Sequence, residues 1–143
     1  MNTGKILTVS GPVVDCGFET GRLPTIREAL RVTVRGETRV MEVVQQLSAT
    51  RVRCVLLGAS EQLSRGMPVE AAGTGIQVPV GEATLGRMFN VLGEPIDGEG
   101  ALPENTPQWE IHRKAPAFAD QRPATELLET GIKVIDLLEP YPK

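Results

Sequence analysis

The chain has 143 residues, of which 41% are hydrophobic, 3% aromatic and 23% charged. This balance is typical of a soluble globular protein and excludes disordered and collagen-like classes. The net charge is −3 and the pI about 5.2. Nucleic-acid-binding proteins usually carry a basic surface, so we expect no nucleic-acid partner.

The hydropathy of the chain gives no reason to expect a membrane span. No stretch approaches the roughly 20 apolar residues that cross a bilayer as a helix. The N-terminus carries no secretory signal pattern, because the apolar run after Lys5 is broken by Pro12. We therefore expect any membrane association to be peripheral and to run through a partner.

Residues 1–75 have the pattern of closely spaced short strands. Leu30, Val32 and Val34 alternate with polar residues, which is the period-two signature of a half-buried strand. The predicted strands are residues 5–9, 13–18, 30–35, 38–47, 52–56 and 67–71. Their number and spacing favour a small closed six-stranded β-barrel or a sandwich. Closure removes exposed strand edges, which favours the barrel.

Residues 76–143 are richer in proline than residues 1–75, and we expect them to form a second domain. Between Gly81 and Gly93 the apolar residues recur at i, i+3, i+4 and i+7, which predicts a helix. These residues are Leu85, Met88, Phe89 and Leu92. A second helix is predicted at 132–138, ended by Pro140.

The stretch between these helices, 97–124, is polar and irregular in sequence. Trp109 and Phe118 are its predicted hydrophobic anchors.

Two cysteines and one histidine limit the metal and disulfide chemistry of the chain. Cys16 and Cys54 lie far apart in sequence, and His112 is the only histidine. Most structural zinc sites use four ligands, so we assign no metal residues. A disulfide between the cysteines is possible, but we expect two free thiols in β-strands in a reducing compartment.

One segment has the glycine spacing of a phosphate-binding loop. Gly81 and Gly86 fit G-x-x-x-x-G-K-[ST], but Arg87 replaces the lysine and Met88 replaces the residue whose hydroxyl binds Mg²⁺. Helical periodicity also runs through the segment. We therefore interpret it as a structural element and assign no cofactor-binding residue here.

Four further candidates have structural interpretations that we favour. Asp15 and Glu19 could pair as carboxylates but flank a predicted turn. His112, Arg113 and Lys114 could contact phosphate, although an exposed loop cluster is commoner. Asp97-Gly98 is a typical turn sequence. Five arginines are expected on the outer face of the sheet: Arg31, Arg35, Arg39, Arg51 and Arg53. We assign no catalytic residue.

Several segments together resemble the β subunit of the F-type ATP synthase. The opening Gly4-Lys5-Ile6 and Gly11–Asp15 and the stretch 40–47 follow the family's order. The longest and most specific block is 78–97, and 128–138 is another. Cys16, Glu139 and Pro142 depart from the family pattern. The resemblance runs along essentially the whole chain.

The resemblance implies a catalytic subunit that makes ATP from ADP and phosphate, driven by a transmembrane ion gradient. It implies a six-stranded barrel over 1–75 that joins other barrels in a crown, and over 76–143 the incomplete start of an α/β nucleotide-binding domain. The phosphate loop and catalytic residues of the family are expected after Lys143. Mg·ATP or Mg·ADP then belongs to the longer parent protein, and no cofactor is expected for this chain.

The partners implied are α subunits in an alternating hexamer and the central stalk γ, peripheral to the cytoplasmic face of the bacterial inner membrane. Alternatives are the non-catalytic α subunit, a vacuolar-type subunit, or a flagellar or secretion ATPase. The chain by itself could also act as an assembly module, with barrel edges and arginine-bearing faces contacting neighbouring barrels. A stand-alone oligonucleotide-binding barrel is disfavoured, because Phe18 is the only aromatic residue of the first half.

The second half lacks the strands against which it would pack in a complete domain. We expect residues 98–143 to be loosely ordered or to pack on another copy of the chain.

Overall fold

The structure is a computed structural model that describes residues 2–19, 21–120 and 126–142. It divides into two compact units, residues 1–113 and 114–143, which are described separately. Within the described residues, no helix has the length and apolar character needed to cross a membrane.

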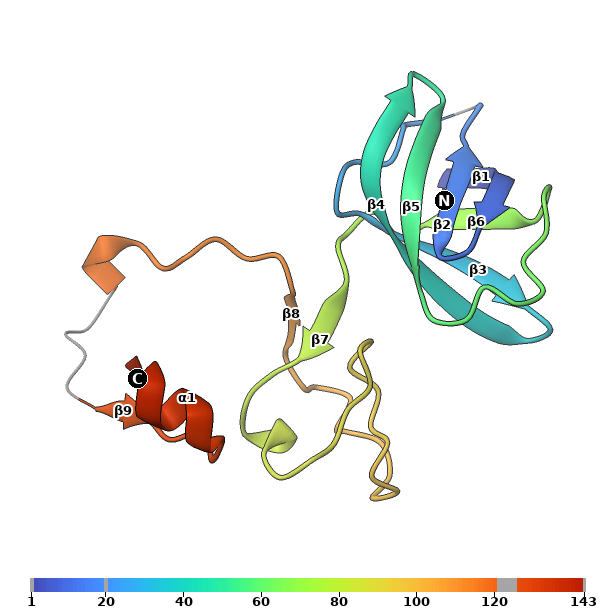
Figure 1. Ribbon diagram of the computed structural model, residues 1–143. Helices are drawn as coiled ribbons and strands as arrows, with labels where there is room; N and C mark the ends of the chain where they lie inside the picture. Colours follow the sequence, from blue (N-terminus) through green and yellow to red (C-terminus); the bar gives the residue numbers. More distant parts are fainter. Residues whose placement is uncertain (1, 20, 121–125, 143) are drawn as a thin grey trace. The chain divides into compact units, whose positions relative to one another are not determined.

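Six antiparallel strands of the first unit form a closed barrel (Figure 1). The strands are β1 (Asn2–Ser10), β2 (Val13–Gly17), β3 (Ala29–Val34), β4 (Glu37–Ser48), β5 (Arg51–Leu57) and β6 (Pro68–Ala71). Their order around the barrel is β1-β2-β5-β4-β3-β6, and the pairing of β1 with β6 closes it. The predicted barrel and all six of its predicted strands are confirmed, with ends shifted by a few residues.

The barrel interior is filled by the side chains that alternate inward along each strand. In β5, for example, Val52, Cys54 and Leu56 are buried while Arg51 is exposed. The buried core of the barrel consists of Ile6, Val14, Cys16, Phe18, Leu30, Val32, Val34, Met41, Val43, Val52, Cys54, Leu56 and Val69. With a single aromatic ring, this core is built almost entirely from aliphatic and sulfur-containing side chains, as the composition predicts.

A two-residue turn fixes the register of β3 and β4. Arg35 and Gly36 both have positive φ angles, 50° and 88°. Positive φ at both central residues is the geometry of a type I′ turn, whose twist matches that of the flanking strands. Val34 consequently faces Glu37, and the inward residue Leu30 faces Met41.

The second half of β4 is irregular and is held by the segment before β3. The register of β4 against β5 shifts between Val43 and Gln45 and again between Gln46 and Ser48. Past the reach of β3, Val43 exchanges backbone hydrogen bonds with Arg27 and Glu28. The segment 27–28 therefore takes the place of a strand beside this part of β4.

A buried carboxylate ties the same segment to the chain that leaves the barrel. Glu28 is 7% exposed. It accepts hydrogen bonds from the backbone and hydroxyl of Thr25, at 2.8 and 3.1 Å, and from the backbone N–H of Gly73 at 3.1 Å. The burial of the carboxylate is offset by these bonds, which fix where β6 ends and the next segment starts.

The rest of the first unit is a small β-ribbon with a long irregular excursion. β7 (Gln77–Pro79) pairs with β8 (Gln108–Glu110), with Val78 opposite Trp109. Between them lie one turn of 3₁₀-helix, Glu82–Thr84, and a series of turns. The helix predicted between Gly81 and Gly93 is therefore wrong.

The physical reason is that local polar contacts override the apolar periodicity. Gly86 has a φ of 73°, which a right-handed helix does not accept. Leu85 and Met88, placed on the apolar face of the predicted helix, are 76% and 60% exposed. The chain instead folds back on itself, with the N–H of Ile96 bonded to the carbonyl of Met88 at 2.8 Å.

The second unit contains short elements. They are a 3₁₀ turn (Phe118–Asp120), β9 (Leu127–Leu128), α1 (Lys133–Leu138) and β10 (Tyr141–Pro142), with β9 and β10 paired. The predicted second helix is confirmed as α1, which ends before Pro140. Residues 121–125, within the stretch expected to be irregular or loosely ordered, lie outside the described residues, and that expectation stays a prediction.

The two aromatic residues predicted as anchors of the irregular stretch are not buried. Trp109 is 51% exposed and Phe118 is 90% exposed. Trp109 lies on the three-residue strand β8 and Phe118 on a single 3₁₀ turn. The predicted division at residue 75 also stays a prediction, since the compact units divide after Arg113.

Two neighbouring valines of β4 test the assignment of the barrel core. Val43 is fully buried and Val44 is 43% exposed. Val43→Ala should lower the free energy of unfolding by about 2 kcal/mol, from two lost methyl groups and the cavity left behind. Val44→Ala should change it by less than about 1 kcal/mol. Chemical denaturation of both variants measures this, and equal losses would contradict the inward assignment of Val43.

Candidate functional site

The outer face of the barrel carries most of the arginines that the sequence placed there. Arg31 and Arg51 are exposed, and Arg39 and Arg53 are half-buried by their neighbours. Arg35 lies in the β3–β4 turn instead of on the sheet. The side chain of Arg39 donates hydrogen bonds to the carbonyls of Ala59 and Glu61. This arginine therefore holds the loop after β5 against the barrel.

Asp15 is not a loop carboxylate, contrary to prediction. It lies in β2 directly opposite Arg53 of β5, and the two form a bidentate ion pair with N–O distances of 2.8 and 3.0 Å. The hydrogen bond from Arg53 lowers the pKa of Asp15. Glu19 lies beyond the end of β2 and is exposed. Asp15 and Glu19 do not form a carboxylate pair, because the pairing of β2 with β5 places Arg53 beside Asp15.

The barrel exterior also has one apolar area. Within the described residues of the barrel, three large hydrophobic side chains are substantially exposed, and they define what we call the β4 patch: Ile26, Val44 and Leu47, at 57%, 43% and 38%. The backbone bonds between 27–28 and Val43, with a bond from Gln46 Nε2 to the carbonyl of Pro24 at 2.9 Å, hold the segment of Ile26 beside β4. Ile26 is thus held beside the strand that carries Val44 and Leu47.

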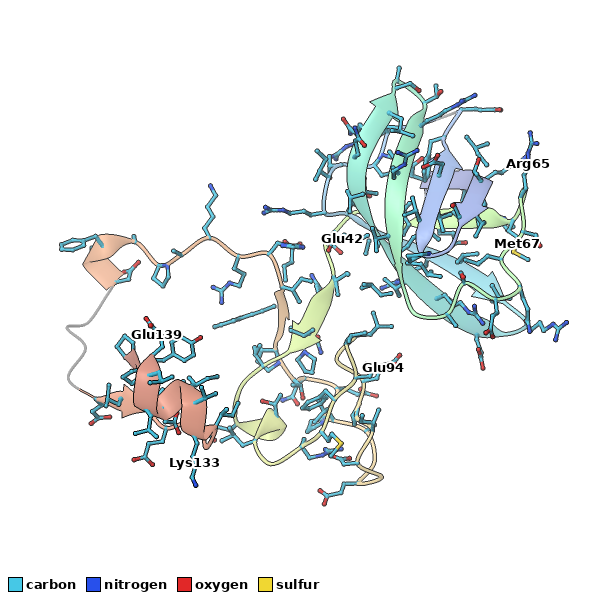
Figure 2. All side chains as sticks on the ribbon, in the orientation of Figure 1. Glu42, Arg65, Met67, Glu94, Lys133 and Glu139 are labelled. Carbon is cyan, nitrogen blue, oxygen red and sulfur yellow. The ribbon has the colours of Figure 1, made fainter. Side chains whose placement is uncertain are left out.

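His112 joins the segment after β8 to the barrel. Its Nε2 lies 2.9 Å from Oε2 of Glu42 on β4 (Figure 2, where Glu42 is labelled). Arg113 stacks on the ring of Trp109, with 3.6 Å between the guanidinium carbon and the ring centroid. The cluster predicted from His112, Arg113 and Lys114 is thus divided, since His112 and Arg113 have different partners.

Among the residues that the structure describes, a densely hydrogen-bonded polar cluster is built on Asp97, which the sequence identified only as a turn residue. Arg87 binds Asp97 through two bonds, of 2.6 and 3.0 Å, and also donates to the carbonyl of Gly100 at 2.6 Å. The same carboxylate accepts the backbone N–H groups of Met88 and Glu99 at 3.1 and 3.0 Å. The predicted turn at Asp97-Gly98 is present, and the Glu99 bond is part of it.

The cluster has a clear electrostatic signature. Arg87 and Asp97 are only 14% and 13% exposed at their side chains. The bond from Arg87, followed by those from the two backbone N–H groups, holds the pKa of Asp97 well below its usual 3.8. Arg87 is the residue that stands at the lysine position of the phosphate-loop pattern, and its guanidinium is directed to Asp97.

The adjoining turn is organised by Asn90. Its side-chain oxygen accepts the N–H groups of Leu92 and Glu94 at 2.9 and 3.0 Å, and its amide donates to Glu94 at 2.7 Å. The residues of this turn, together with Arg87, Met88 and Asp97 of the neighbouring cluster, fall inside the 78–97 block on which the family resemblance mainly depends. That block therefore encodes a specific turn architecture.

A second side-chain cap of this kind precedes α1 in the other unit. Asp136 accepts hydrogen bonds from the N–H and the hydroxyl of Thr130 at 3.0 and 2.6 Å, and from the N–H of Gly131 at 3.0 Å. The bonds from Thr130 lower the pKa of Asp136. The spacing from Thr130 to Asp136 thus has a structural role in shaping the turn that starts the helix.

Both cysteines are free and buried in strands of the barrel, as predicted. Across the part of the chain that the structure describes, no three side chains of His, Cys, Asp or Glu gather where they could hold a metal ion.

The barrel is the part of the chain that matches a known family of proteins. Residues 6–73 match the model of the ATP synthase alpha/beta family, beta-barrel domain. The barrel is similar to the barrel domain of that family. The match covers β1 from Ile6 through β6, just under half of the chain, and is shared by the alpha and beta subunits. It supports an origin in the alpha/beta family without separating the two subunits.

The role of Asp97 in holding the turn around Met88 and Glu99 can be tested by mutation. Asp97→Asn removes the charge that binds Arg87 and weakens the acceptor for Met88 and Glu99. We expect faster amide hydrogen exchange at Met88 and Glu99, measured by NMR. Glu99→Gln is the matched control, because Glu99 is 72% exposed at its side chain and 3.9 Å from Arg87. Unchanged exchange in Asp97→Asn would contradict the role of this carboxylate.

The same cluster should resist acid. Because the folded-state pKa of Asp97 is lowered, its contribution to stability is complete above the ordinary pKa near 3.8 and is lost only as the pH falls through the lower folded value. A carboxyl NMR titration of Asp97 should therefore show its midpoint below 3.8. A midpoint at or above that value would refute the ion pair.

Proposed function

We propose that the chain is the N-terminal part of the catalytic β subunit of a rotary ATP synthase, whose parent makes ATP from ADP and phosphate with a transmembrane ion gradient. The observation that carries the proposal is the closed six-stranded barrel over the residues that match the alpha/beta family. The resemblance of block 78–97 to the β subunit favours it over the α subunit. An α, vacuolar-type or export ATPase subunit is the alternative.

Within such an enzyme the described chain acts in assembly. A closed barrel pairs β1 with both β2 and β6, so a neighbour contacts the side chains of its outer face rather than a free sheet edge. We expected barrel edges to contact neighbouring barrels; we now propose that the outer side-chain face of the barrel makes this contact. The β4 patch offers the apolar centre of such a contact, with charged residues around it, as in other protein interfaces.

The exposed apolar residues after the barrel support a longer parent. Leu85, Val91 and Leu137 are each at least 73% exposed. Side chains of this kind are normally covered by another element or subunit when they occur in number. We propose that the nucleotide-binding domain of the parent covers them, and that this domain, not the present chain, binds Mg·ATP or Mg·ADP.

The remaining parts of the proposal follow from the family resemblance. The partners are α subunits, alternating in a hexamer, and the central stalk γ. The location is peripheral, at the cytoplasmic face of the bacterial inner membrane or the equivalent organelle face.

Assembly with the α subunit tests the proposal. Native mass spectrometry of the chain mixed with the α subunit of the same cell should show a complex. Val44→Glu should weaken it at least tenfold by placing a charge in the β4 patch. Thr38→Glu is the matched control, since it adds the same charge to an exposed position of the same strand.

Two outcomes would count against different parts of the proposal. Absence of any complex with the wild-type chain would overturn the assembly role. A complex that tolerates Val44→Glu as well as Thr38→Glu would keep the assembly role and reject the β4 patch as its contact.

Nucleotide binding tests the placement of the site. Calorimetric titration of the 143-residue chain with Mg·ATP should give no binding heat, because Arg87 is held by Asp97 and Met88 cannot ligate Mg²⁺. Tight binding would contradict the claim that the nucleotide site lies in a later part of the parent.

A further inference from the structure

Asp97 is followed by Gly98, and this is the only place in the sequence where aspartate or asparagine precedes glycine. The carboxyl group of an aspartate can be attacked by the backbone nitrogen of the next residue, which closes a five-membered succinimide ring. Glycine hinders this attack least, because it has no Cβ and leaves the backbone free to adopt many conformations. The sequence therefore contains one chemically favoured site for this rearrangement.

The structure holds the carboxylate of Asp97 in a fixed position. Oδ2 accepts hydrogen bonds from Nε of Arg87 at 2.6 Å and from the backbone N–H of Met88 at 3.1 Å. Oδ1 accepts from Nη2 of Arg87 and from the backbone N–H of Glu99, both at 3.0 Å. The side chains of Asp97 and Arg87 are only 13% and 14% exposed. The carbon that would be attacked, Cγ of Asp97, is thus fixed by its hydrogen-bond partners and mostly shielded from solvent.

These contacts oppose ring closure in two ways. The reaction removes one carboxyl oxygen as water, and whichever oxygen leaves, its bonds to Arg87 and to a backbone N–H are lost. The reaction also proceeds more readily from the neutral carboxyl than from the carboxylate. The bond from Arg87 lowers the pKa of Asp97 and so keeps the carboxylate ionised. Both effects disappear when Arg87 moves away.

Other positions in the chain lack one part of this combination. Asp136 is also held by hydrogen bonds, from Thr130 and Gly131, but the residue after it is leucine. Asn90 is followed by valine, whose branched side chain hinders attack by its own backbone nitrogen. Only at Asp97 does a residue with a reactive successor lie in a closed cluster.

We propose that Asp97-Gly98 is an isomerisation site that Arg87 keeps closed, and that it converts to isoaspartate when the pair of Arg87 and Asp97 opens. First, the nitrogen of Gly98 forms a bond to Cγ of Asp97 while the bond from Cγ to one carboxyl oxygen breaks. That oxygen leaves as water with the carboxyl proton and the proton of the nitrogen. Water then adds to the main-chain carbonyl carbon of Asp97, whose bond to the nitrogen breaks, and the nitrogen regains a proton. The overall reaction gains and loses no atom and needs no oxidant.

The product no longer holds the turn. Its backbone runs through Cβ and Cγ of residue 97 and is longer by a methylene group, and its free carboxylate lies on a different carbon. The bonds that fix Met88 and Glu99 cannot re-form with the same geometry. Arg87 therefore protects the turn chemically as well as shaping it. This inference is independent of the proposed role in ATP synthase.

The test compares the ageing of the folded and the denatured 143-residue chain at neutral pH. Isoaspartate is counted by methyl transfer from S-adenosylmethionine with an L-isoaspartyl methyltransferase, and is located by mass spectrometry of peptides. In guanidinium chloride the wild type should form isoaspartate at position 97 at least about tenfold faster than the folded wild type, since no local opening is then required. Equal rates would overturn the proposal, as would the absence of isoaspartate at position 97 in the denatured chain.

Arg87→Gln tests the role of the arginine. Because it removes a charged, bidentate donor, the folded variant should isomerise about tenfold faster than the folded wild type. Glu99→Gln is the matched control and should age like the wild type, because Glu99 Oε2 lies 3.9 Å from Arg87 and its side chain is 72% exposed. In the denatured state all three chains should react at similar rates, as expected if the arginine acts only through the fold.

Two results would refute parts of this scheme. A folded Arg87→Gln chain that ages no faster than Glu99→Gln would show that the arginine does not close the site. An unchanged rate in denatured Gly98→Ala would contradict attack by the backbone nitrogen, because the added methyl group should slow it. NMR spectra establish whether each variant keeps its barrel. The comparison of folded and denatured wild type decides the proposal even where a variant does not fold.

Discussion

β1 hydrogen-bonds to β2 on one side and to β6 on the other, and this double pairing is the constraint on which the first unit depends. It turns a six-stranded sheet into a barrel and encloses one aliphatic core. The close packing at this junction requires glycine at position 4. A Cβ there would lie 2.5 Å from the carbonyl oxygen of Gly17 and 2.8 Å from the ring of Phe18. Phe18, the one aromatic ring of the core, can cover the barrel interior only because that position is bare.

Outside the barrel core, carboxylate side chains that accept hydrogen bonds from backbone N–H groups hold the turns in place. Glu28 is bonded to Gly73, and Asp97 to Met88 and Glu99. Each carboxylate fixes backbone groups that no sheet or helix would otherwise satisfy. In the second unit, Asp136 does the same for Thr130 and Gly131. This explains how segments with so few buried apolar residues have defined turns, and why large apolar side chains near them stay available to another domain or subunit.

Features that arise from a local repeat in the sequence could be predicted, whereas features that arise from contacts between distant residues could not. Strand positions in the barrel could be predicted because inward and outward residues alternate with period two, as in Val52, Cys54 and Leu56. The helix expected at 81–93 could not be excluded, because Leu85, Met88, Phe89 and Leu92 have helical spacing by coincidence. Only the bonds from Arg87 to Asp97 and the left-handed conformation at Gly86 decide that segment. The spacing of charged residues carries no comparable period from which such a cluster could be read.

The sequence by itself determined the class of fold, the strands, the free cysteines and the absence of a recognisable phosphate loop in 81–88, since each rests on local pattern or residue chemistry. Tertiary structure decided which residues meet. Strand register paired Asp15 with Arg53, the barrel interior brought Cys16 against Met41, and the segment after β8 brought His112 to Glu42, seventy positions away. Register arises from the closure of the whole barrel and from turn geometry, so partners distant in sequence become neighbours that no short window of the chain contains.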